Sequence, residues 1–207
     1  MNWKSKTFLL IVLNLFFIYS HVNGQVATYE ELLKQPVFTS LKKALENPDQ
    51  VYRLKLSGNM HCDTIPDLIF QFKNLQELTI TRGKLLKINH KINELQYLVY
   101  LDISNNRLVD LPEEICDLPN LQYLIISRNK IYKLPENIGN LSSLKMIDAW
   151  DNIFYTLPLS ITKLKDSLKM LDILQIPIKD EEYNEMKKLL PNTEILYTPV
   201  CPCMLDR

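Results

Sequence analysis

The sequence has 207 residues, and its 24 Lys and Arg are balanced by 24 Asp and Glu, so the formal net charge at pH 7 is zero. This balance excludes a general electrostatic attraction to nucleic acid. There are 36 Leu and 20 Ile but only 4 Gly, which lie too far apart for a GxGxxG or GxxxxGK phosphate-binding loop. The composition thus excludes dinucleotide-binding and P-loop enzymes.

Residues 1–24 have the regional order of a secretory signal peptide. Lys4 and Lys6 form a positive amino-terminal region, residues 8–19 are mainly apolar, and residues 22–24 supply a cleavage site. The apolar run is about half of the roughly 20 residues that a membrane-spanning helix needs. An uncleaved anchor is the alternative. We expect an exported chain, periplasmic, secreted or on the cell surface, with no stable membrane span after cleavage.

Residues 25–50 predict two short helical segments, divided by Pro36 and closed by Pro48. Their apolar residues are Leu32, Leu33, Phe38, Leu41 and Leu45. We interpret this stretch as a helical amino-terminal cap, which would cover the apolar end of the region that follows.

Residues 51–178 repeat one apolar pattern six times. The copies start near residues 51, 75, 98, 121, 144 and 168, and the sixth copy is incomplete. The third copy shows the pattern in full: Leu98-x-x-Leu101-x-Ile103-x-x-Asn106-x-Leu108-x-x-Leu111-Pro112-x-x-Ile115-x-x-Leu118. Positions within each repeat are numbered here from the residue equivalent to Leu98.

This pattern resembles that of the leucine-rich repeat family, in its LxxLxLxxNxLxxLPxxIxxLxx form, and the cap sequences resemble those of small exported bacterial members. The resemblance implies an α/β fold, a leucine-rich-repeat solenoid. Such a solenoid has a short parallel sheet on its concave face, an irregular or short helical convex face, and helical caps at both ends. The residues agree independently, because LxxLxL alternates apolar and polar side chains with the period of a strand.

The Asn at position nine of each repeat carries both a donor and an acceptor, which suits a turn where the chain leaves the strand. We expect a stacked ladder of Asn59, Asn106, Asn129 and Asn152, interrupted at Gly83 and Ile176. The Pro that follows the later Leu of several repeats lacks an N–H group. It therefore fits the irregular outer arc, where no strand pairing is needed.

Residues 179–198 predict a charged helix followed by a short apolar strand, which together form a carboxyl-terminal cap. Residues 199–207 form a tail that contains Cys201 and Cys203. The expected order of parts is signal peptide, helical cap, six repeats, helix-strand cap and tail.

Side chains at equal positions of successive repeats should form columns on the concave face. In the later repeats these columns carry aromatic residues and Met where the fold does not require them, and such residues are favoured at binding hot spots. We therefore hypothesise a site for a protein or peptide ligand formed by Tyr100, Asp102, Tyr123, Ile125, Met146, Asp148, Trp150 and Asp151.

Two other interpretations of this face remain open. The carboxyl-terminal cap or the tail, with Tyr197 and Val200, could fold over the apolar patch. The charges also grade along the columns, from Arg53, Lys55 and Arg82 at one end to several Asp at the other. This gradient could serve a partner or could be an ordinary solvated surface.

Apart from the Cys201-Pro-Cys203 pair, the sequence contains no pattern for catalysis, a cofactor or a metal. His61 and His90 lie in different repeats and form no HExxH motif. We expect a monomeric, non-enzymatic binding module without a cofactor and without a nucleic-acid partner. The alternative function is an envelope structural or tethered protein, or a thiol- or metal-binding protein, that acts through Cys201 and Cys203.

Overall fold

The computed structural model describes residues 26, 28–58 and 62–199, and the chain divides into two compact units after Pro36. The expected signal peptide and the two cysteines of the tail lie outside the described residues. The first unit contains helix α2 (Tyr29–Leu32), and the second contains all the repeats.

Helix α2 begins with a reciprocal capping arrangement. Thr28 Oγ1 accepts a hydrogen bond from the Glu31 N–H at 3.3 Å, and Glu31 Oε2 accepts one from the Thr28 N–H at 2.9 Å. Each bond satisfies an N–H group that a helix start leaves without a partner. The first of the two expected helical segments therefore forms, although it is only one turn long.

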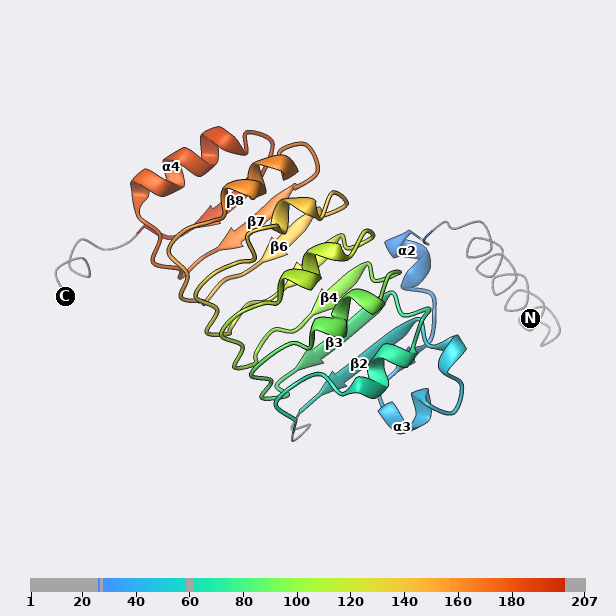
Figure 1. Cartoon of the computed structure of the whole chain (residues 1–207). Coiled ribbons are helices and arrows are strands. Elements are labelled where there is room, and N and C mark those ends of the chain that lie inside the picture. The colour runs from blue at the N-terminus through green and yellow to red at the C-terminus, as the bar shows by residue number, and fades with distance from the viewer. Residues whose placement is uncertain (1–25, 27, 59–61, 200–207) are drawn as a thin grey trace, which may run out of the picture. The chain divides into compact units, whose positions relative to one another are not determined.

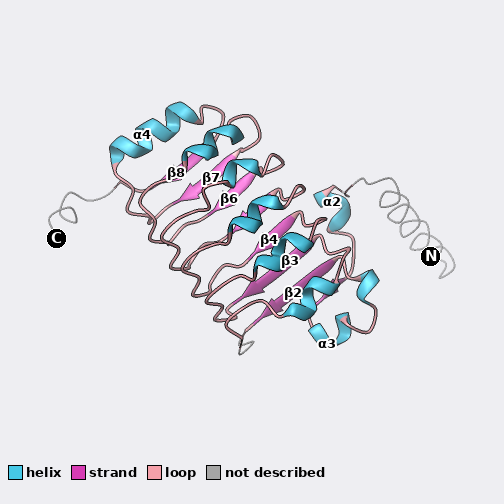
Figure 2. Cartoon of the chain, in the orientation of Figure 1, coloured by secondary structure: helices cyan, strands magenta, loops and turns pink. Residues whose placement is uncertain are grey.

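The second unit is built on one parallel sheet, whose eight strands within the described residues follow the order of the chain (Figures 1 and 2). The strands are β1 (Val37–Phe38), β2 (Arg53–Ser57), β3 (Glu77–Thr81), β4 (Tyr100–Asp102), β5 (Tyr123–Ile125), β6 (Met146–Asp148), β7 (Met170–Ile173) and β8 (Glu194–Tyr197). One strand forms in each LxxLxL segment, which confirms the predicted solenoid. Strand β1 falls in a stretch for which the sequence predicts only helices, and it extends the sheet by pairing with β2.

Short helices connect the strands on the other side of the sheet (Figure 2). They are α3 (Leu41–Ala44), η1 (Pro48–Gln50), η2 (Asp67–Gln71), η3 (His90–Glu94), η4 (Glu113–Asp117), η5 (Ile138–Asn140), η6 (Leu159–Leu164) and α4 (Asp180–Leu189), where η marks a 3₁₀ helix. Pro66, Pro112 and Pro158 stand directly before η2, η4 and η6. At a helix start the missing N–H of Pro costs no hydrogen bond.

The fixed Leu and Ile positions of the repeats fill one continuous core. In the third repeat, for example, Leu101, Ile103 and Leu108 have no exposed surface, and the same cluster extends from Ala44 to Leu190. Burying each such side chain contributes about 1.5–3 kcal/mol. A single repeat has only one apolar edge, so each repeat depends on its neighbours for this burial.

Buried Asn side chains are the polar counterpart of the core. Asn129 Oδ1 accepts from the Leu108 N–H of the preceding repeat at 3.1 Å. Asn129 Nδ2 donates to the carbonyl oxygens of Ile103 at 3.1 Å and Ile126 at 2.8 Å, one in the preceding repeat and one in its own. The side chain thus pairs with backbone groups of two successive repeats where the chain leaves its strands.

The same arrangement recurs at Asn106 and Asn152, so the expected ladder forms at three of its positions. Asn59 lies outside the described residues. At the interruption, the Gly83 N–H donates to Asn106 Oδ1 at 2.9 Å, and a Cβ on Gly83 would lie only 3.3 Å from that oxygen. The small residue at this position therefore keeps room for the neighbouring amide.

The residue before each ladder position adopts a left-handed backbone conformation. The residues at this eighth position are Gly58, Arg82, Asn105, Arg128, Asp151 and Gln175, and all have positive φ angles. This conformation is unfavourable for most L-residues, which shows how strongly the surrounding packing determines the turn. The turns line one edge of the stack, called the turn edge below (Figure 1).

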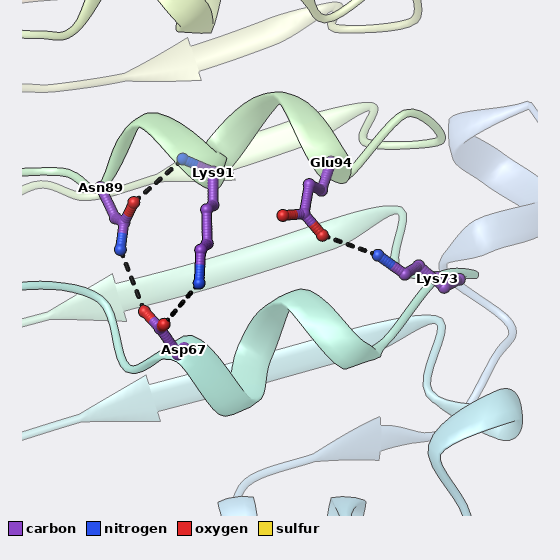
Figure 3. Close-up of polar contacts among 5 residues, drawn as sticks. All are labelled: Asp67, Lys73, Asn89, Lys91 and Glu94. Atoms are coloured by element: carbon purple, nitrogen blue, oxygen red, sulfur yellow. Dashed lines mark hydrogen bonds and ion pairs between the residues drawn. The ribbon is translucent and has the colours of Figure 1, made fainter.

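Polar side chains also link the 3₁₀ helices of neighbouring repeats, as Figure 3 shows for η2 and η3. Lys91 Nζ lies 2.6 Å from Asp67 Oδ2, and Lys73 Nζ lies 2.8 Å from Glu94 Oε2. Asn89 Nδ2 donates to Asp67 Oδ1 at 3.0 Å. The hydrogen bond to Asp67 raises the pKa of Lys91, and the hydrogen bond from Lys73 lowers the pKa of Glu94. Because these groups are exposed, we assign them to local orientation of the helices.

We predict that Asn129→Ala will lower the free energy of unfolding by about 3 kcal/mol, because it leaves the buried Leu108 N–H without a partner and removes one of the two side-chain hydrogen bonds to each of the Ile103 and Ile126 carbonyls. Urea denaturation measures the change. The control is Asn140→Ala, whose exposed side chain contacts Lys163 at 3.4 Å and should change stability by less than about 0.5 kcal/mol. Equal effects of the two variants would contradict the ladder's role.

Candidate partner-binding face

Strand register brings six of the eight predicted site residues together on the sheet. The third-position column contains Tyr100, Tyr123 and Met146, and the fifth-position column contains Asp102, Ile125 and Asp148. Neighbouring strands of a sheet lie about 4.8 Å apart, so side chains within a column are in contact range. All six are partly exposed, because the alternate positions of the same strands point into the core.

The aromatic residues of this face are arranged around two contacts. The rings of Tyr100 and Tyr123 lie 6.0 Å apart with a tilt of 39°. The Arg128 guanidinium lies 4.4 Å from the centre of the Trp150 ring, a cation–π contact between successive repeats. Sequence reasoning missed Arg128 as part of this face. The signal was available, because register places an eighth-position residue beside the seventh position of the next repeat.

Asp148 is the most constrained polar residue of the face. Its Oδ2 atom accepts from Ser127 Oγ at 3.2 Å, whereas its Oδ1 atom is buried and has no hydrogen-bond partner within the described structure. Burial raises the pKa of Asp148, and the nearby carboxylates of Asp172 and Asp102 raise it further. The hydrogen bonds from Ser127 and the Trp150 backbone oppose this rise.

Asp151 is placed differently from the other predicted residues. It is exposed and adopts the left-handed conformation at the turn edge, with a φ of 56°. Its carboxylate therefore lies at the border of the face and not within the columns. Trp150, which precedes it, is partly exposed.

The expected charge gradient is not present as the sequence suggested. Arg53 is only 6% exposed and forms an ion pair with Glu77, which has no exposed surface. Lys55 Nζ lies 2.7 Å from Glu77 Oε1. The single carboxylate of Glu77 therefore offsets one of the two positive charges at the predicted basic end of the concave columns, and Arg82 lies at the turn edge. Register pairs Arg53 with Glu77, which explains this ion pair.

The alternative in which Tyr197 covers the aromatic patch does not hold. The Tyr197 ring stacks on the Tyr183 ring of α4 at 4.2 Å, and its hydroxyl donates to the Ile178 carbonyl at 3.0 Å. Tyr197 is therefore held at the carboxyl-terminal helix. Val200 lies outside the described residues.

Within the described residues, no group of three or more His, Cys, Asp or Glu is placed to hold a metal ion. Burial raises the pKa of the Cys116 thiol to about 12, with further contributions from Glu113 and Asp117, so this thiol is poorly suited to nucleophilic chemistry. None of the helices in the described residues is long and apolar enough to cross a membrane.

The comparison with protein families identifies the chain. The family model of the leucine-rich repeat region matches residues 50–192, which is more than half of the sequence. The chain therefore belongs to the leucine-rich repeat family. A search of curated protein sequences gave no significant match.

Solved structures of bacterial leucine-rich repeat proteins are similar to the chain. A leucine-rich repeat protein of Leptospira interrogans is 32% identical with a TM-score of 0.65, and the match covers 80% of this chain and 47% of that protein. Internalin C2 of Listeria monocytogenes is 23% identical with a TM-score of 0.63, over 80% of this chain and 69% of the internalin. The chain spans about half of the Leptospira protein, and the likeness to the internalin shows the fold alone.

We predict that Asp148→Asn will raise the melting temperature at pH 7 by about 1–3 °C, because it removes a negative charge directly opposite Asp172 on the next strand. A raised pKa in the folded state means that ionised Asp148 destabilises the fold at neutral pH. The advantage of Asn should therefore shrink as pH falls through that raised pKa and the wild-type carboxylate becomes protonated. Thermal unfolding from pH 7 to pH 4 measures this.

The exposed Asp166→Asn variant serves as the control and should show no comparable change. A lower melting temperature of Asp148→Asn at pH 7 would contradict the assignment of a destabilising charge.

Proposed function

We propose that this chain is a non-enzymatic binding module that holds a protein or peptide segment on its concave face. The observation that carries the proposal is the register-aligned surface of Tyr100, Tyr123 and Met146, with Trp150 at its border. Aromatic residues supply a large apolar contact area with few rotatable bonds, and the flexible Met side chain adapts to the shape of a partner, which favours both at binding surfaces. The core does not need them there, because these positions point away from it.

The carboxylates beside the aromatic column indicate what a bound segment would contribute. Asp102, Asp148 and Asp172 occupy the fifth position of their repeats, with Ile125 between the first two. A segment that combines an apolar side chain with Lys or Arg would complement both columns. An incoming cation would also stabilise the ionised form of Asp148, whose Oδ1 atom has no partner within the described residues.

The domain plan and the cellular location are part of the same proposal. Residues 1–24 would direct export, residues 25–50 and 179–198 would cap the solenoid, and residues 51–178 would carry the binding face. We further propose that the exported chain acts as a monomer in the periplasm, at the cell surface or in the medium.

We predict that Trp150→Ala will weaken binding of a concave-face ligand by about 2 kcal/mol or more, a loss of about 30-fold in affinity. Peptides selected from a random display library on the wild-type protein provide the ligands, and isothermal titration measures their affinities. The loss has two expected causes, the indole contact area and the Arg128 contact that orients it.

The matched control is Leu68→Ala on the convex helix η2, because this side chain is apolar and 44% exposed but distant in sequence from the face. Affinity should remain within about twofold in this variant. Selected peptides that bind Trp150→Ala as tightly as wild type, with its circular dichroism spectrum intact, would refute the concave site.

A further inference from the structure

A cluster of cations lies on the turn edge, at the border of the concave face. Arg82 and Arg128 occupy the eighth position of their repeats, and Lys84, Arg107 and Lys130 occupy the tenth, on either side of the Asn ladder. A shallow pocket at this edge is lined by Arg82, Lys84, Asn105, Asn106, Arg107 and Arg128. We call the five cationic side chains the basic edge.

Backbone hydrogen bonds between repeats hold the basic edge in register. The Arg107 N–H donates to the Leu85 carbonyl at 2.9 Å, and the Lys130 N–H donates to the Leu108 carbonyl at 2.8 Å. The Arg82 N–H donates to the Asn105 carbonyl at 3.1 Å. These bonds set the tenth-position cations of successive repeats about one strand spacing apart, roughly 5 Å, whereas Asn105 stands between the eighth-position residues Arg82 and Arg128.

The cations of the basic edge are not neutralised by the protein. All five side chains are exposed, and none forms an ion pair within the part of the chain that the structure describes. Two further cations, Lys87 and Lys133, follow at the thirteenth position. The acids at equivalent positions are Asp110 and Asp151. A chain with a formal net charge of zero thus concentrates positive charge along one edge.

An exposed apolar row runs beside the basic edge. At the twelfth position of four successive repeats stand Leu86, Val109, Tyr132 and Tyr155, which are 39–63% exposed. Ile153, at the tenth position, adds a fifth exposed apolar side chain. We call these five residues the apolar row. These side chains lie outside the buried core, and the fold does not require large apolar residues at these exposed positions.

The apolar row and the basic edge share one side of the molecule. From the third repeat on, the tenth and twelfth residues are exposed and the eleventh is buried, as in Arg107, Leu108 and Val109. Lys84, Leu85 and Leu86 of the second repeat show the same burial order, although Lys84 has a left-handed φ of 62°. This alternation is that of an extended chain, so the tenth and twelfth side chains point the same way. The Tyr132 N–H donates to the Val109 carbonyl at 3.1 Å, which continues the row from repeat to repeat.

We propose that this side of the solenoid docks on an anionic phospholipid surface. The cations would contact the phosphate groups, and the apolar row would enter the boundary between headgroups and acyl chains. Unpaired Lys and Arg together with adjacent exposed apolar and Tyr side chains form the combination that interfacial lipid binding uses. A soluble polyanion would bind the basic edge alone, and the exposed apolar row would then have no contact with the ligand.

The docking site and the concave face use different residues apart from Arg128. The basic edge lies at the turns that follow the strands, whereas the proposed ligand lies across the strands themselves. The two proposals can therefore fail independently, apart from Arg128, which belongs to both. For this reason the test leaves Arg128 unchanged.

The test is sedimentation of the purified protein with vesicles of phosphatidylglycerol and phosphatidylcholine, or of phosphatidylcholine alone. The salt concentration is 0.1 M, at which the Debye length is about 10 Å. An apolar amino-terminal segment would adsorb to both vesicle types, so the readout is the difference between them. In the triple variant Lys84→Gln, Arg107→Gln, Lys130→Gln, the preference for phosphatidylglycerol-containing vesicles should fall about 100-fold, because each cation contributes about fivefold to the partition coefficient.

The matched control removes three exposed cations elsewhere, in Lys165→Gln, Lys187→Gln, Lys188→Gln, and should bind within about threefold of wild type. The double variant Val109→Ser, Tyr132→Ser should weaken binding by about tenfold or more. Equal losses in the two triple variants, or no preference for phosphatidylglycerol, would overturn the proposal. Displacement by millimolar glycerol phosphate, or undiminished binding of the serine variant, would instead indicate a soluble anionic ligand and would also overturn it.

Discussion

The structure depends on how each repeat leaves its strand. A chain that turns out of a short parallel strand buries N–H and carbonyl groups that the sheet cannot pair, and each unsatisfied group would cost about 1–3 kcal/mol. Asn106, Asn129 and Asn152 remove this cost, because one amide side chain supplies both donor and acceptor to two repeats. The ladder therefore satisfies the turns and fixes the position of each repeat against the last.

Fixed register is what turns a repeated sequence into two surfaces. Once the repeats are aligned, side chains at equal positions form columns, and only the columns that point inward pack in the core. Tyr100, Tyr123 and Met146 are then neighbours although each is 23 residues from the next. The same alignment stacks the tenth and twelfth positions at the turn edge, so that a cation and an apolar side chain recur together, as in Lys130 and Tyr132. Both proposed surfaces thus follow from one constraint.

The sequence was sufficient for the fold because the fold uses fixed residue types at fixed spacing. Leu101 and Ile103 point inward as the period of two requires, and Asn106 lies where a turn needs an amide. The columns of the concave face followed from the same period. What the sequence could not reveal depends on contacts between columns. The burial of Glu77 by its cationic neighbours and the Asp148 oxygen that has no partner within the described residues both require side-chain conformations, whereas register alone could have placed Arg128 beside Trp150. Strand β1 was missed because it is two residues long and gains its stability from pairing with β2.

The Asn side chains, and not solvent, satisfy the backbone groups at the turns. Amide hydrogen exchange of Leu108 and Ile131 tests it most directly, because their N–H groups donate to Asn129 Oδ1 at 3.1 Å and Asn152 Oδ1 at 3.0 Å. In the native protein these two amides should exchange as slowly as those of the neighbouring strands, through opening of the whole stack. Exchange at the rate of exposed loop amides would show that water satisfies the turns, and the account of register built on the ladder would be wrong.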